Sequence, residues 1–240
     1  MRPRVAIPVP HSTDAEYAGR ALPQYERAVE QAGGEPVRIP LDRTIAEIHL
    51  LVQHCEAVLL PGSRADVDPE KYLAVRDQKT ADADLPRDAV DEFLLQDAFE
   101  RRKPVLGICY GLQSLNVYRA GSLVQHIESP INHEAGRTVA LAHEVAVDAG
   151  SRLAEIVKQA NADPARLPVN SSHHQSADAI GRGLRIVARC PQDGIVEALE
   201  GTEPDHFVLA VQWHPERSID DDEASRAIFR SLVEAAKKSI

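Results

Sequence analysis

Long apolar runs are missing from this sequence. No stretch approaches the roughly 20 apolar residues that a membrane-spanning helix needs, so we expect no membrane partner. Residues 1–8 also lack the apolar stretch of roughly 7–15 residues and the small-residue cleavage site of a secretory signal. We expect them to form a first strand. Together these absences predict a cytoplasmic protein.

Cysteine and basic residues are also scarce. The three cysteines, Cys55, Cys109 and Cys190, are odd in number and form no CxxC pair, which favours a reducing compartment over a disulfide framework. Lysine and arginine total 27 against 37 aspartate and glutamate, a formal net charge of −10. A nucleic-acid partner is not expected, because a phosphate backbone requires a basic surface. No P-loop or dinucleotide-type glycine pattern occurs, and we expect no cofactor.

What is present is an alternation of short apolar runs with helical patterns. The 240 residues, 43% of them hydrophobic, are enough for one α/β domain with a sizeable core. The alternation predicts a mostly parallel central sheet flanked by helices on both faces. Strands are expected at 4–9, 36–39, 57–60 and 105–108, and helices at 22–32, 45–52, 90–101 and 110–119.

The second half of the chain has more strands and fewer helices. We expect strands at 138–147, 184–190, 195–199 and 207–211, with helices at 151–160 and 219–237. Some of these strands should pair antiparallel at one edge of the sheet. No linker divides the chain, so a single domain over 1–240 is predicted. Residues 63–86 form a long polar connection, which is a candidate lid loop.

One thiol stands in the sequence context of a catalytic nucleophile. Cys109 lies between Gly107 and Gly111, at the end of an apolar run. This is the spacing of a nucleophile elbow, in which a strand enters a helix through a strained turn that exposes the central side chain. The glycines let the two backbones approach closely. The first turn of a helix also favours a thiolate, because its unpaired N–H groups carry partial positive charge.

A base and an orienting carboxylate occur near the end of the chain. His214 and Glu216 are two residues apart, and such residues point to the same side of an extended backbone. Glu216 is expected to orient His214, which would exchange a proton with Cys109. Two backbone donors are available for a negative oxygen. One is the N–H of Tyr110, directly after the nucleophile, and the other comes from the turn at 61–63.

A thiol can also be an ordinary buried side chain. That interpretation suits Cys55 and Cys190, which have no catalytic context around them. It suits Cys109 less well, because a base, an orienting carboxylate and a proline-glycine turn accompany it.

With these residues identified, the sequence resembles the class I glutamine amidotransferase-like superfamily. Within it the chain is similar to the gamma-glutamyl-gamma-aminobutyrate hydrolase family of cysteine peptidases. The segments around the thiol and around Trp213-His214-Pro215-Glu216 mark the superfamily. Asp-Val-Asp-Pro at 66–69 and Ser-His-His-Gln at 172–175 point to the stand-alone hydrolase branch. The resemblance extends from about residue 35 to the last helix and implies a flavodoxin-like sheet.

The resemblance also implies roles for individual residues. Catalysis would fall to Cys109, His214 and Glu216, the oxyanion site to Gly62, Ser63 and Tyr110, and the glutamyl amino and carboxylate groups to Gln113, Ser172 and His173. Two positions depart from the family pattern. Ser63 stands where a second glycine is more common, and Tyr110 stands where the hydrolase branch commonly has arginine.

Histidines raise the separate question of a metal. His173 and His174 are adjacent, and His133 and His143 could add ligands. Adjacent histidines usually diverge in direction, and no cysteine or carboxylate stands beside them at zinc-like spacing. We therefore expect substrate contact or loop structure at these residues, and no metal.

Three functions compete. The favoured one is hydrolysis of a small-molecule γ-glutamyl amide through a glutamyl thioester on Cys109. The second is a glutaminase subunit that supplies ammonia to a separate synthase partner. The third is an inactive binding protein on the same fold. The identity of the leaving amine and the existence of a homodimer stay open.

Overall fold

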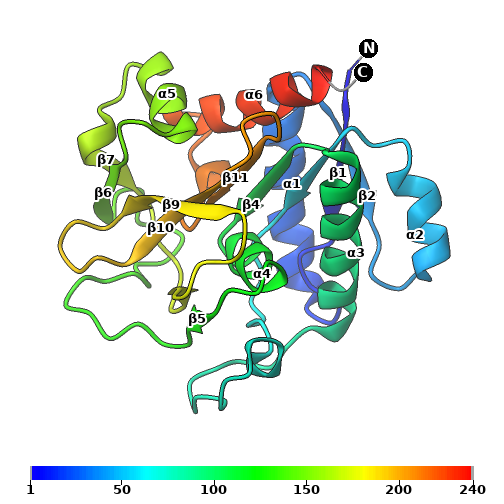
Figure 1. The fold of residues 1–240 in the computed structure, drawn as a ribbon, viewed down its shortest axis with the longest axis horizontal. Coiled ribbons are helices and arrows are strands. Elements are labelled where there is room, and N and C mark those ends of the chain that lie inside the picture. Colours follow the sequence, from blue (N-terminus) through cyan, green and yellow to red (C-terminus); the bar gives the residue numbers. More distant parts are fainter. Residues whose placement is uncertain (1, 239–240) are drawn as a thin grey trace.

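The computed structural model describes residues 2–238 and is built around one nine-stranded sheet in the order β2-β1-β3-β4-β11-β10-β9-β6-β7. Five neighbouring strands are parallel: β2 (Glu35–Ile39), β1 (Arg4–Pro8), β3 (Ala57–Leu60), β4 (Val105–Ile108) and β11 (Val208–Val211). Figure 1 shows them side by side between helices. The predicted α/β class is confirmed.

Helices cover both faces of the parallel strands. One face carries α1 (Ala15–Gln31), α5 (Arg152–Gln159) and α6 (Glu223–Lys237), and the other carries α2 (Ile45–Val52), α3 (Leu85–Arg101) and α4 (Tyr110–Tyr118). Successive residues of β3 alternate between the two cores: Leu59 packs with α1, and Leu60 with α3. Burying such a side chain contributes about 1.5–3 kcal/mol, so each strand is fixed from both sides.

The predicted antiparallel edge is confirmed in the second half of the chain. It consists of β10 (Val196–Gly201), β9 (Leu184–Arg189), β6 (His143–Val147) and β7 (Leu167–Val169). A separate short pair, β5 (Leu123–Val124) with β8 (Ser176–Ala177), lies under α4. These short strands were not predicted, because two or three residues give no detectable alternation.

Four predicted boundaries were wrong by four residues or more. The helices expected from 22 and 90 begin at Ala15 and Leu85, where the Asp14 and Asp84 side chains cap them. The strand expected from 138 begins at His143, because its neighbour β7 is only three residues long and supports no longer ladder. The last helix begins at Glu223 rather than near 219, because the Asp222 carboxylate caps the N–H groups of Ala224 and Ser225.

The candidate lid loop at 63–86 projects beyond the carboxyl ends of the parallel strands (Figure 1). It contains one short 3₁₀ helix, Pro69–Tyr72. Gln125 ties the loop down by accepting from Asp77 N and Thr80 Oγ1, each at 2.8 Å. At the tip, Leu73 and Val75 are almost fully exposed. Gln125 also donates to the Val75 carbonyl oxygen at 2.8 Å, so the loop is anchored at 75–80, next to its exposed apolar side chains.

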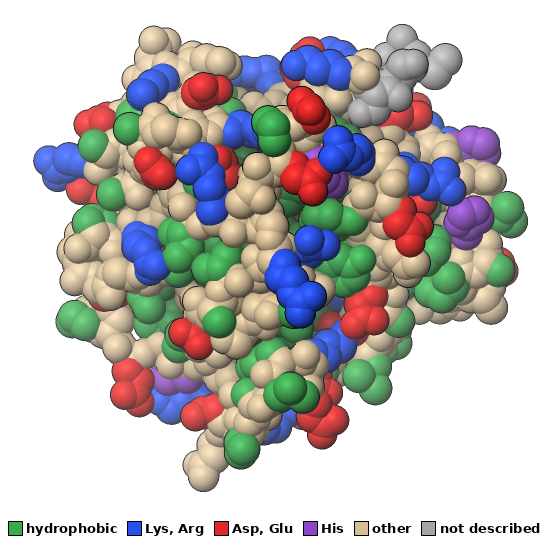
Figure 2. All heavy atoms as spheres, in the orientation of Figure 1, with side chains coloured by type: hydrophobic (Ala, Val, Ile, Leu, Met, Phe, Trp, Pro, Cys, Tyr) green, Lys and Arg blue, Asp and Glu red, His purple; other side chains and the backbone are tan. Residues whose placement is uncertain are grey.

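Within residues 2–238, no helix is long and apolar enough to cross a membrane. Figure 2 shows acidic and basic side chains interspersed over the face that it presents, rather than gathered into one basic surface. That distribution agrees with the acidic composition.

Candidate active site

Cys109 is the turning point between β4 and α4. Its φ of 53° and ψ of −105° are rare for a residue with a side chain, and such backbone strain typically costs about 1–3 kcal/mol. A Cβ on Gly111 would lie 2.2 Å from the carbonyl oxygen of Leu60, and one on Gly107 would lie 2.7 Å from the carbonyl oxygen of Gly111. Only glycine fits at either position. The structure has the predicted elbow.

His214 and Glu216 lie where β11 ends and a 3₁₀ turn, Pro215–Arg217, begins. The Nδ1 of His214 is 2.7 Å from Oε1 of Glu216. Since a carboxylate only accepts, Nδ1 carries the hydrogen and Nε2 is left with a lone pair. Both side chains are buried, which fixes the ring and its tautomer. This is the orienting contact expected from the sequence.

Asn170 holds the backbone of the base. Its side-chain amide donates to the His214 carbonyl oxygen at 2.8 Å and accepts from the His214 N–H at 2.9 Å. Asn170 is buried. Nothing in the sequence around Asn170 indicates a contact with a residue 44 positions away.

The nucleophile and the base meet beside Gly62. A Cβ on Gly62 would lie 3.0 Å from Cε1 of His214 and 3.7 Å from Cβ of Cys109. Two side chains that are 105 positions apart in the sequence therefore lie within 4 Å of one point. The Cys109 side chain retains 6% exposure, which limits access to a narrow approach.

Burial shifts the pKa of both groups toward the neutral form. It raises the pKa of the Cys109 thiol to about 12, and the nearby Arg217 guanidinium and the Tyr110 N–H only partly oppose this. Burial also lowers the pKa of His214, although Glu216 opposes this effect. The thiolate expected from the helix terminus is therefore not the resting form. Desolvation outweighs the helix dipole here, and the pair rests as thiol and neutral imidazole.

The predicted oxyanion donors differ in availability. The Gly62 N–H already donates to the hydroxyl of Tyr25 at 3.0 Å. Within the part of the chain that the structure describes, the N–H groups of Ser63 and Tyr110 donate to no oxygen, and the Tyr110 N–H faces the Cys109 sulfur. Tyr110 N is also the first helical position, where N–H groups are unpaired. Ser63 and Tyr110 are thus the free donors, and Gly62 supplies the space between them.

Arg87, which no sequence pattern singled out, supports this turn from beneath. It is fully buried, pairs with Asp91 at 2.7 Å, and donates to the carbonyl oxygens of Pro10 at 3.0 Å and Pro61 at 2.7 Å. Its guanidinium also lies over the ring of Tyr110, 5.0 Å from the centroid. One side chain of α3 therefore fixes both turns that carry the free donors.

The three predicted substrate residues lie in different surroundings. Gln113 is one helical turn after Cys109, and its Nε2 donates to the Gln175 carbonyl oxygen at 3.2 Å. The Ser172 hydroxyl accepts from Arg217 Nη1 at 2.8 Å. The His173 ring is buried and faces Glu197, with 3.5 Å between Nε2 and Oε1. His173 thus lies beside His133, His143 and Glu197, a group of three whose ligand atoms are all within 4.8 Å of one another.

Cationic side chains surround the mouth of the site. Arg20 and Arg64 each lie over the ring of Tyr17, at 5.9 and 5.3 Å from its centroid. Partial burial lowers the pKa of Arg137, and the charges of Arg20, Arg217 and Arg64 lower it further. These groups are arginines on four separate segments, which no local pattern could have brought together. They make the mouth attractive to an anionic solute.

The chain is similar to a known protein family and to individual proteins. The Peptidase C26 family matches residues 8–216. A Mycobacterium tuberculosis protein named as a glutamine amidotransferase is 38% identical over 91% of this chain and 68% of its own. The gamma-glutamyl-gamma-aminobutyrate hydrolase of Escherichia coli O157:H7 is 35% identical over 90% of this chain and 86% of its own.

Solved structures show the same fold at low sequence identity. The glutaminase domain of Trypanosoma brucei CTPS superposes with a TM-score of 0.64 at 18% identity, covering 98% of this chain and 94% of that domain. PurLQS from Thermotoga maritima superposes with a TM-score of 0.59 at 19% identity, covering 98% and 99%. The fold is that of the class I glutamine amidotransferases, and the relatives support a hydrolase. The chain belongs to the Peptidase C26 family.

Proposed function

We propose that this protein hydrolyses the amide bond of a small γ-glutamyl compound through a glutamyl thioester on Cys109. The observation that carries the proposal is the approach of Cys109 and His214 to one point beside Gly62, with Glu216 on the far nitrogen of the ring. The names of the relatives at 34–35% identity favour a γ-glutamyl substrate.

The resting protonation state of Cys109 and His214 determines the first chemical step. His214 Nε2 takes the thiol proton as sulfur attacks the γ-carbonyl carbon, so that thiolate forms only as the C–S bond forms. The imidazolium then gives that proton to the departing amine, and the C–N bond breaks. Water attacks the thioester, its proton passes to His214, and sulfur leaves with a proton returned from the ring. Glu216 stabilises the cationic ring in both halves.

The negative oxygen of each tetrahedral intermediate would be held by the N–H groups of Ser63 and Tyr110. Each such donor typically contributes about 2.7–4 kcal/mol to the transition state. The amino and carboxylate ends of the glutamyl group would be held by two side chains. They are Gln113, which lies one helical turn after Cys109, and the cationic Arg217, which lies near Cys109. Arg137 at the mouth would add attraction for that carboxylate.

A panel of γ-glutamyl amides tests the proposal. The purified chain should release amine from at least one member, and the Cys109→Ala variant should release none above background. Site-resolved alkylation of Cys109 in the wild type serves as the control for a folded, accessible thiol. If Cys109 alkylates and the whole panel remains uncleaved, the proposal is wrong.

The glutaminase alternative keeps the same chemistry with glutamine as substrate and a synthase as acceptor of ammonia. The name of the Mycobacterium tuberculosis relative favours it. A glutaminase subunit should show low glutamine turnover alone and a marked rise when cell extract supplies its partner. Full turnover of a γ-glutamyl amide without extract favours the stand-alone hydrolase.

The proposal also covers the compartment of the protein and the role of its long loop. Cys55, Cys109 and Cys190 are all free, which suits a reducing compartment such as the cytoplasm. The 63–86 loop stands at the same end of the sheet as the site, with one single domain beneath it. Its position and its exposed Leu73 and Val75 side chains suit a lid that selects the leaving amine.

A further inference from the structure

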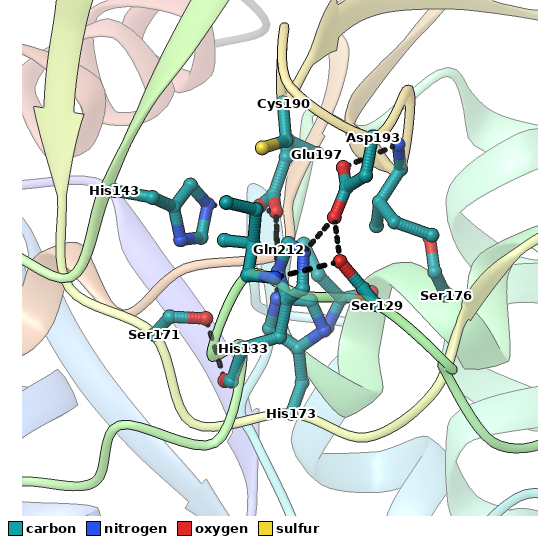
Figure 3. A network of polar contacts seen from close by, with 12 residues as sticks. Ser129, His133, His143, Ser171, His173, Ser176, Cys190, Asp193, Glu197 and Gln212 are labelled. Atoms are coloured by element: carbon teal, nitrogen blue, oxygen red, sulfur yellow. Dashed lines mark hydrogen bonds and ion pairs between the residues drawn. The ribbon is translucent and has the colours of Figure 1, made fainter.

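A second group of titratable side chains lies beside the site, at the antiparallel end of the sheet. We name it the histidine cluster: His133, His143, His173 and Glu197. His143 begins β6, Glu197 is on β10, and His133 and His173 come from two loops (Figure 3). No more than 2% of any of these side chains is exposed. Four separate segments thus bury four metal-ligating groups together.

The histidine cluster is arranged around one carboxylate oxygen. Oε1 of Glu197 lies 3.2 Å from Nδ1 of His133, 3.0 Å from Nε2 of His143 and 3.5 Å from Nε2 of His173. In a tetrahedral zinc site with bonds of about 2.0–2.2 Å, adjacent ligand atoms are roughly 3.3 Å apart. The ligand atoms of His133, His143 and Glu197 lie within 4.8 Å of one another. Small side-chain rotations would close them onto one ion.

In His133 and His173, the ring nitrogen that faces away from Glu197 (the outer nitrogen) has a hydrogen-bond partner. That partner determines whether the nitrogen facing Glu197 (the inner nitrogen) carries a hydrogen or a lone pair. His133 Nε2 is 2.8 Å from Oδ2 of Asp193, and His173 Nδ1 is 3.0 Å from the carbonyl oxygen of Gln175. Both partners are acceptors, so each outer nitrogen carries the hydrogen. With the hydrogen on the outer nitrogen, the neutral form of each ring has its lone pair toward Glu197. Histidine ligands of metals are held in this way, by a carboxylate or carbonyl on the outer nitrogen.

Among the inner ring nitrogens, only His143 Nε2 makes a hydrogen bond, to Glu197 Oε1 at 3.0 Å. His133 Nδ1, His173 Nε2 and Glu197 Oε2 are buried without a partner among the described residues. A protonated ring would need to aim its N–H at the carboxylate oxygen, yet the contacts of His133 and His173 do not have that geometry. The unpartnered nitrogens of His133 and His173 and the unpartnered oxygen of Glu197 could all be satisfied by one shared cation.

A divalent ion would balance the charge of the cluster. The nearest carboxylates are Glu197 in the cluster and Asp193 behind His133. Three neutral rings, two carboxylates and one divalent cation give zero net charge, as buried groups require. Two protons would also give zero, and the experiment below separates these cases.

A neighbouring arrangement is less suited to an ion. His133, Cys190 and Asp193 also lie close together. Asp193, however, already accepts from His133 Nε2 and Ile195 N and also bonds Ser129. The Cys190 thiol donates to Oε1 of Gln192 at 3.0 Å, so its sulfur already has a partner. Asp193 and Cys190 therefore lie outside the ligand set.

The histidine cluster has a route to solvent. A hollow of about 290 Å³ beside it is lined by residues 126–134, apart from Glu128, and by His173 and His174. An ion that enters this hollow meets the rings of His133 and His173 first. A buried site with such an entry path can exchange its ion without unfolding.

We propose that His133, His143, His173 and Glu197 bind one divalent transition-metal ion, with zinc the best match to three imidazoles and one carboxylate. The four positions are filled by protein, which makes the site structural rather than catalytic. The sequence offered no carboxylate at zinc-like spacing, because Glu197 comes from a strand beyond His173. The ion would join the His133 loop to residues 170–175, which reach Gln113 through the Gln175 carbonyl oxygen.

Metal content of the untagged protein tests the proposal directly. Protein stripped with a chelator and dialysed against Zn²⁺ should retain roughly one ion per chain, as a four-ligand structural site does. At free Zn²⁺ about 100-fold above the Kd, Tm should rise by about 5–10 °C. Co²⁺ in its place should give the intense visible absorption of tetrahedral coordination. Retention of less than a tenth of an equivalent, with no Tm shift, overturns the proposal.

Two variants locate the ion. His143→Gln removes a ligand and should lose the retained ion, whereas His126→Gln changes a histidine that lines the hollow outside the set and should keep it. Equal loss in both variants, or in neither, contradicts the proposed ligand set. If His143→Gln fails to fold, the Co²⁺ spectrum of the wild type decides: octahedral bands or none count against the site.

Discussion

Burial acts on both members of the candidate catalytic pair, and this is the main consequence at the residue scale. A raised pKa at Cys109 and a lowered pKa at His214 place the proton on sulfur and leave the ring ready to accept it. The base is neutral at pH 7 because its pKa lies below the ordinary value of about 6.5. Catalysis would begin with proton transfer rather than with a preformed ion pair.

A pH profile tests this resting state. Lowering the pH should reduce kcat/KM only below about pH 6.5, as His214 becomes protonated. Raising it should leave kcat/KM flat through pH 9, because the neutral thiol–imidazole pair persists up to the thiol pKa of about 12. A fall above pH 8 would contradict the account, since it would mark the loss of an imidazolium that the resting enzyme needs. Alkylation of Cys109 by iodoacetamide should rise about tenfold per pH unit over the same range, as expected for a thiol well below its pKa.

Substitutions separate the roles within the triad. Cys109→Ala and His214→Asn should each lower kcat on the order of 10⁴- to 10⁶-fold, with Tm little changed. The fall in kcat for Glu216→Gln should be about 10- to 100-fold smaller than for those two variants, because His214 remains as the base although it loses the orienting charge. Steady-state kinetics and thermal melts on the three variants are the measurement. Similar activity in all three variants would refute these role assignments.

At the element scale, the carboxyl ends of β3, β4 and β11 carry the site, and α3 holds the turn after β3 in place. Arg87 reaches from α3 to the carbonyl oxygens of Pro10 and Pro61, so that its position determines where the Ser63 N–H points. An arginine in a buried ion pair gives little net stability. Its contribution here would be the geometry of the turn.

Paired variants distinguish geometry from stability at Arg87. Arg87→Met alone leaves Asp91 charged and buried without its partner, which should destabilise the fold by about 3–5 kcal/mol. Arg87→Met with Asp91→Leu removes both charges and should recover most of that loss in denaturant melts. If the turn depends on Arg87, kcat stays reduced in the double variant. Full recovery of kcat along with stability would show a purely structural role.

The sequence predicted helices and strands best where the pattern of apolar residues matches the faces that are buried in the fold. The strand at 57–60 matched because both of its faces are apolar, and the elbow matched because only glycine fits at Gly107 and Gly111. The sequence could not predict contacts that depend on the assembled fold. Arg87, Asn170 and Glu197 resemble ordinary surface residues in sequence, and their burial becomes apparent only when distant segments meet.

At the scale of the whole molecule, the parallel and antiparallel halves of the sheet carry different groups of functional side chains. The parallel half brings together the nucleophile, the base and the oxyanion donors at strand ends, as ligand sites in such sheets commonly form. The antiparallel half carries β6 and β10, and with them the histidine cluster beside residues 170–175. Metal removal should therefore raise KM more than it lowers kcat, because the ion joins loops near Gln113 and touches neither Cys109 nor His214.

The central claim is covalent attack by Cys109 on a γ-glutamyl carbonyl. It is tested most directly by acid-quenching the enzyme during turnover of a γ-glutamyl amide and mapping the adduct by peptide mass spectrometry. The account predicts a glutamyl increment on the peptide that contains Cys109, absent from Cys109→Ala and removed by hydroxylamine as a thioester is. Turnover that continues in Cys109→Ala, or an increment found only on Cys55 or Cys190, would contradict it.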